Sequence, residues 1–160
     1  MELTLTIGQV LALFGAAIAV FLAGAGSAKG VGIAGEAAAG VVSEKPELFG
    51  QTLVFELLPG TQGIYGFLIG FIVLIKLNVL GGAWNPISLE QGLIIMAGCL
   101  PIGVVGLLSA IAQGKAAAAS IGLLAKRPES SGQGISFTVM VETYAVLALL
   151  ASFLIVWFAA

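Results

Sequence analysis

Four long apolar stretches constrain this chain more than any other feature of its sequence. They cover about residues 5–28, 52–75, 93–112 and 135–158. A helix of about 20 apolar residues is long enough to cross the hydrocarbon core of a bilayer. Hydrophobic residues make up 59% of the chain and charged residues 9%, which is too little charge for the surface of a soluble domain. The sequence therefore predicts an all-α membrane protein with four transmembrane helices.

The basic residues predict how these helices are oriented. Five of the six lie in the connections that follow the first and third stretches, and positive charge is retained on the cytoplasmic side. We therefore expect a multi-pass protein of the cell membrane with both termini outside and both charged connections in the cytoplasm. The chain then divides into a first helical hairpin at 1–78, an extracellular loop at 79–91 that contains Trp84, and a second hairpin at 92–160.

The two hairpins resemble each other around their charged turns. SEKPELFG at 43–50 and AKRPESSG at 125–132 align with Pro46 opposite Pro128, and the same register places Gly60 opposite Glu142. Repeated units of equal orientation indicate a duplicated helical hairpin. The acid of the second hairpin is therefore replaced by glycine in the first.

The first and third helices align in a different register. GSAKG at 26–30 matches AQGKA at 112–116, a shift of four positions that predicts an insertion or deletion near the charged turn. Both helices also carry small residues every four positions, a spacing that lets helices approach closely in membranes. This spacing fits packing within one bundle, or an inner wall where copies of the chain crowd into a ring. The small residues are Gly24, Ala28 and Gly32, then Gly106, Ala110, Gly114, Ala118 and Gly122.

Polar residues interrupt the second apolar stretch. Leu58, Thr61, Gln62 and Tyr65 share one helix face. Pro59 lacks an N–H and clashes with the preceding turn, so we expect a kink that frees backbone carbonyls nearby.

The fourth helix brings a carboxylate to the same depth. The repeat places Glu142 level with the polar face of the second helix, where Tyr65 could donate its phenol hydrogen to the carboxylate. Gln113 lies at the cytoplasmic end of the third stretch, directly after Ala112, and it meets the others only if that helix continues further than its apolar run. A charge buried in the membrane costs about 2.5–3.5 kcal/mol on insertion scales, so Glu142 is expected to be functional.

The candidate site offers hard oxygen donors with one negative charge. They are the Glu142 carboxylate, the amide oxygens of Gln62 and Gln113, the Thr61 hydroxyl and a backbone carbonyl. A divalent ion would normally draw more than one carboxylate, so the set favours a monovalent cation. Na⁺ uses such a cage, and a proton, which would also neutralise the carboxylate, does not need one. We therefore expect Na⁺, with H⁺ as the alternative.

Three motifs occurring together extend this interpretation. With LPGTQGIYGF at 58–67, IAQGKAAAA at 111–119 and MVETYA at 140–145, the chain resembles over nearly its whole length the membrane rotor (K, or proteolipid) subunits of bacterial V-type sodium-translocating ATPases. The resemblance implies a homo-oligomeric ring of many copies that turns against a stator membrane subunit, driven by a central-shaft subunit. A stator arginine would displace the ion.

The resemblance also assigns roles to single residues. It implies Na⁺ ligation by the Leu58 backbone carbonyl, Thr61, Gln62, Gln113 and Glu142, with Tyr65 hydrogen-bonded to the carboxylate. The remaining acid near the site, Glu56, lies about 120° around the helix from Gln62 and stays outside this ligand set.

Other function classes fit the sequence less well. No phosphate-binding loop occurs, so we expect no catalytic site in this chain and ATP hydrolysis on another subunit. A net charge of −2 gives no basic patch for nucleic acid. A four-helix small-molecule exporter coupled through Glu142 would need a cavity with aromatic walls. A passive structural pore would have no use for a single buried acid.

Overall fold

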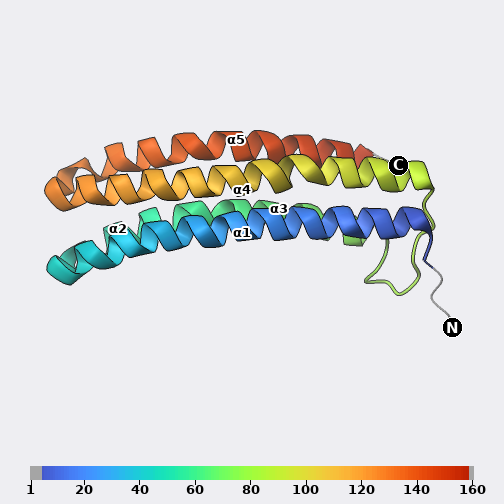
Figure 1. The fold of residues 1–160 in the computed structure, drawn as a ribbon, viewed down its shortest axis with the longest axis horizontal. Helices are drawn as coiled ribbons and strands as arrows, with labels where there is room; N and C mark the ends of the chain where they lie inside the picture. Colours follow the sequence, from blue (N-terminus) through green and yellow to red (C-terminus); the bar gives the residue numbers. More distant parts are fainter. Residues whose placement is uncertain (1–4, 159–160) are drawn as a thin grey trace.

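The computed structural model describes residues 5–158, which form two long helical hairpins lying side by side (Figure 1). No strand occurs in this range. Four helical segments in it are long and apolar enough to cross a membrane, as predicted from the sequence. The elements are α1 (Ile7–Glu44), the 3₁₀ turn η1 (Pro46–Leu48), α2 (Phe49–Leu57), the 3₁₀ turn η2 (Leu58–Gly60), α3 (Thr61–Lys76), α4 (Leu89–Lys126), the 3₁₀ turn η3 (Pro128–Ser130) and α5 (Ser131–Phe158).

The lengths of α1 and α4 exceed what a bilayer requires. Each has 38 residues, which corresponds to about 57 Å of helix at 1.5 Å per residue. The hydrocarbon core is about 30 Å thick. Both helices are therefore long enough to extend beyond the membrane toward the charged turns.

The internal repeat has a single register. Three pairs of features have the same separation in the sequence as Pro46 and Pro128. They are the first residues of α1 and α4, the last residues of these two helices, and the turns η1 and η3. The different register predicted for the first and third helices is therefore wrong, and no insertion separates the hairpins. Small residues recur every four positions in these helices, so a shift of four aligns them almost equally well.

Matching sequence signals begin and end the long helices. Thr6 caps α1 through a reciprocal bond with Gln9, and Ser88 caps α4 through the same bond with Gln91. Both helices stop before a proline, whose ring disfavours helical dihedrals in the preceding residue. The repeat thus extends to the hydrogen bonds that define each helix.

The two hairpins meet mainly through α1 and α4, which pack closely along their length. Gly30 and Gly114 lie at this contact, and a Cβ atom on Gly114 would collide with the backbone of Gly30. Gly114 therefore serves packing inside the chain. Gly32 differs, because a Cβ atom there would meet none of residues 5–158 within 4 Å apart from its own helix. A role for Gly32 between copies stays a prediction.

Candidate ion-binding site

The break between α2 and α3 places two oxygens together at the start of α3. Pro59 has no N–H to donate to the preceding turn, and the chain forms the 3₁₀ turn η2 there. The Thr61 hydroxyl donates to the Leu58 carbonyl at 3.0 Å. A Ser27 hydroxyl on α1 accepts the Gly63 N–H at 2.7 Å and ties the irregular segment to the first helix.

Two glutamine side chains meet in the interior between α3 and α4. Gln62 and Gln113 are both 0% exposed. The Gln62 Nε2 donates to the Gln113 Oε1 at 2.6 Å. The Gln113 Nε2 in turn donates to the Thr138 backbone carbonyl at 3.2 Å and to the Glu142 Oε2 at 3.4 Å. The α4 helix continues far past its apolar run, which brings Gln113 to the depth of Gln62.

The Glu142 carboxylate completes this group from α5. Its Oε1 accepts the Tyr65 phenol hydrogen at 2.5 Å, so the carboxylate is held between Tyr65 on one side and Gln113 on the other. Glu142 is only half-buried. It also lines a groove of about 380 Å³ on the outer surface of α5, together with Val139, Thr143, Val146 and Leu147. The site therefore has a polar inner side and an apolar outer opening.

One polar atom of the site lacks a partner. The Gln62 Oε1 is buried and accepts no hydrogen bond from any of residues 5–158. Leaving a buried acceptor unpaired costs about 1–3 kcal/mol, so such atoms in native structures call for an explanation. A cation bound beside the Glu142 carboxylate would give the Gln62 Oε1 a partner, because Gln62 bonds to Gln113 and Gln113 bonds to that carboxylate.

The charge of the site also fits a monovalent cation. Among residues 5–158, no three side chains of the His, Cys, Asp and Glu types gather into one cluster. Glu142 is thus the single carboxylate among the polar groups described above. A divalent ion would normally draw more carboxylates.

The structure brings most of the predicted residues into one hydrogen-bonded group. Tyr65, Glu142, Gln113 and Gln62 form a continuous chain of bonds across three helices. Thr61, one turn before Tyr65 on α3, forms a separate pair with the Leu58 carbonyl of η2.

Sequence reasoning missed two members of the site. Thr138 receives a bond from Gln113 through its backbone, and Ser27 holds the start of α3. Thr138 lies one turn before Glu142, so it could have been found from helical spacing. Backbone acceptors leave no other signal in a sequence. Glu56 lies away from the group, against Gly35 of α1.

The ATP synthase C-subunit family matches the chain twice, over residues 14–73 and 96–155. The two matches have the same separation as the two helical hairpins, which agrees with the repeat. The V-type sodium ATPase subunit K of Enterococcus hirae is 51% identical over 149 residues, which cover 93% of this chain and 92% of that protein. The A-type ATP synthase subunit K of Methanocaldococcus jannaschii is 40% identical over 146 residues, 91% of this chain and 61% of that protein.

Proposed function

The chain belongs to the ATP synthase C-subunit family, and we propose that it is the subunit of a rotary V-type ATPase rotor ring that binds Na⁺ and carries it across the membrane. It is a multi-pass membrane protein of a family that forms oligomeric rings in ATPase complexes. The observation that carries the proposal is the buried, unpaired Gln62 Oε1 in the same hydrogen-bonded group as a lone carboxylate. The name of the E. hirae relative supports sodium as the ion.

In this proposal the ion is held by oxygens from three helices. The ligands are the Glu142 carboxylate, the side-chain oxygens of Thr61, Gln62 and Gln113, and the Leu58 carbonyl. With Na⁺ bound the group is formally neutral, which removes the cost of carrying a bare carboxylate through lipid. Tyr65 keeps Glu142 turned inward through its 2.5 Å hydrogen bond.

Release requires Glu142 to leave this arrangement. The carboxylate borders the groove on the outer surface of α5, so breaking the Tyr65 bond lets it turn outward. A positive charge on the stator, supplied by an arginine, would compete for the carboxylate there. Rotation brings each occupied site to that charge in turn, while ATP hydrolysis on other subunits drives the ring through a central shaft.

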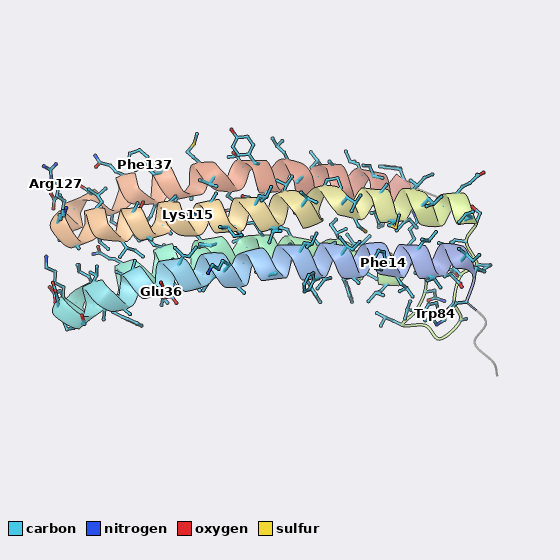
Figure 2. The ribbon with its side chains drawn as sticks, in the orientation of Figure 1. Phe14, Glu36, Trp84, Lys115, Arg127 and Phe137 are labelled. Carbon is cyan, nitrogen blue, oxygen red and sulfur yellow. The ribbon has the colours of Figure 1, made fainter. Side chains whose placement is uncertain are left out.

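The orientation follows from the two ends of the hairpins. Arg127 and Trp84 lie at opposite ends of the molecule (Figure 2). We assign the end with the charged turns to the cytoplasm and the end with Trp84 and both termini to the outside, because basic residues stay on the cytoplasmic side.

Carbodiimide labelling of the purified ring tests this function. The reagent modifies protonated carboxyl groups, and we expect Glu142 to be the main modified residue. Added Na⁺ should slow the reaction near neutral pH, because the ion and the proton compete for one carboxylate. Glu142→Gln should remove the labelling, whereas the matched control Glu56→Gln should leave both labelling and protection unchanged. Labelling of Glu142 that Na⁺ fails to slow at any pH would favour the proton-carrying alternative.

A further inference from the structure

The second hairpin exposes a face that the first hairpin buries. Each residue of one hairpin has a counterpart in the other, defined by the register that pairs Pro46 with Pro128. Phe55 on α2 is 0% exposed, whereas its counterpart Phe137 on α5 is 65% exposed. The same contrast continues along this face, where the pairs are Gln62 (0%) with Tyr144 (67%) and Val73 (0%) with Ile155 (39%). The first member of each pair is buried where the two hairpins meet, and the described part of the chain provides nothing equivalent for the second member.

Inside the chain, Phe55 fits a space that small residues of the second hairpin leave open. A Cβ atom on Gly134 would lie 3.0 Å from the Phe55 Cζ and 3.1 Å from the Ser120 Cβ. The ring therefore lies close to the backbone of α5 and next to α4. Phe55 belongs to a buried cluster with Ala117 and Ile121, which fixes the cytoplasmic half of the hairpin pair.

The first hairpin carries the counterpart of this space on its free side. The counterparts of Gly134, Ser120 and Thr138 are Thr52, Ala38 and Glu56. All three line one groove of about 240 Å³ between α1 and α2. The other lining residues are Gly35, Ala39, Val42, Phe49 and Leu53.

We propose that Phe137 of one copy inserts into this groove on the next copy, so that the contact between copies repeats the contact between the two hairpins of one chain. A ring requires each copy to present two different, complementary surfaces. Phe137 projects from α5, whereas the groove belongs to α1 and α2 of the other hairpin (Figure 2). The inference rests on the ring assembly of the family and is independent of the ion that the ring carries.

A polar contact at the charged turns supports the same register. The Lys45 Nζ donates to the Ala125 carbonyl at the C-terminal end of α4. The counterparts of this pair are Arg127, which is exposed, and Ser43 near the end of α1. Carbonyls at helix C-termini favour cationic donors. The repeated contact therefore places the Arg127 guanidinium of one copy on the last turn of α1 in the next.

The groove also gives Glu56 a place outside the ion site. Its carboxylate lies beside Gly35, where a Cβ atom would be 3.0 Å from the Glu56 Oε1. Thr138, the counterpart of Glu56, is fully buried. Glu56 therefore lines the groove that the next copy covers.

Cross-linking in membranes tests this contact. In a Cys99→Ala background, Phe137→Cys is combined with Leu53→Cys, at a groove residue that is 37% exposed, and treated with a short bifunctional maleimide. Because Phe137→Cys removes an aromatic ring, the contact has room for the reagent. We expect dimers and higher multimers on a denaturing gel. The matched control is the counterpart pair Phe55→Cys with Ile135→Cys, which should link within one chain and stay at monomer size, as mass spectrometry of its peptides would show.

A second control separates this contact from random collision. Phe137→Cys with Val20→Cys places the thiols at different depths, because Val20 precedes Gly35 by about 22 Å along α1 at 1.5 Å per residue. This pair should give no multimers. Monomers alone from Phe137→Cys with Leu53→Cys, under conditions where the Phe55 and Ile135 pair links, would overturn the proposal. Equal multimer formation by the Val20 pair would overturn it as well.

Discussion

Replacing Gln62 by methionine removes the unpaired oxygen of the candidate site while keeping the length and shape of the side chain. Two effects on the ion-free protein oppose each other. The Gln113 Oε1 loses its 2.6 Å donor, which costs about 1–3 kcal/mol. The buried, unpaired Gln62 Oε1 disappears, which returns about the same amount. The stability of the ion-free protein should therefore change by about 1 kcal/mol or less.

Sodium binding has no such compensation. The variant loses one oxygen ligand in a buried site, and the loss of a buried polar partner costs about 1–3 kcal/mol. Na⁺ affinity should therefore fall roughly 5–150-fold, since about 1.4 kcal/mol corresponds to a factor of ten. The assay is Na⁺ binding to the purified ring, together with thermal unfolding in the absence and presence of Na⁺.

Gln9→Met is the matched control for this experiment. Gln9 is also a buried glutamine, 4% exposed, but it bonds to the Asn85 carbonyl at the opposite end of the molecule from the charged turns. It should lower the unfolding temperature and leave Na⁺ affinity unchanged. If Gln62→Met bound Na⁺ as tightly as the unaltered protein, the amide oxygen would not be a ligand, and the reasoning from its missing partner would fail.

Three further predictions concern charge and packing. Glu142→Gln should keep the ring intact, because a neutral amide costs less in lipid than a carboxylate, while ATP-driven Na⁺ uptake into vesicles falls to background; substantial remaining uptake would mean that the ion is held elsewhere. Gly114→Ile should prevent α1 and α4 from pairing, because its side chain meets the backbone of Gly30, and the protein should fail to fold in detergent. Gly32→Ile should leave each chain folded but disturb ring assembly, and rings of normal size and stability would place Gly32 away from other copies.

The helices and most of the candidate site could be predicted because polar groups are costly in a membrane. Glu142, Gln62 and Gln113 stand out from their apolar surroundings, so a sequence alone identifies them as a group. Helical spacing then relates Thr61 and Tyr65 to Gln62 on one face. The resemblance supplied the Leu58 carbonyl, which the structure places next to the Thr61 hydroxyl.

The packing of the small residues could not be predicted in the same way. Glycine and alanine carry no side-chain chemistry that fixes one register, and their four-residue spacing allowed an alignment of α1 with α4 that was four residues wrong. Neither could the sequence separate Gly114, where an added Cβ atom would collide with the backbone of Gly30, from Gly32, where the described residues leave room for one. That difference depends on how α1 and α4 are rotated about their axes.

The pairing of Gly60 with Glu142 in the repeat sets a mechanical ratio for the ring. The circumference of a ring grows with the number of hairpins, whereas the charge carried in one turn grows with the number of ion-binding carboxylates. Under the proposed function this chain has one such carboxylate for two hairpins. A ring of given circumference then moves half as many ions per turn as one with an acid in every hairpin. If one turn delivers a fixed amount of work, each ion receives twice as much. Because a charge costs about 2.3 kcal/mol per 100 mV, such a ring can work against twice the membrane potential.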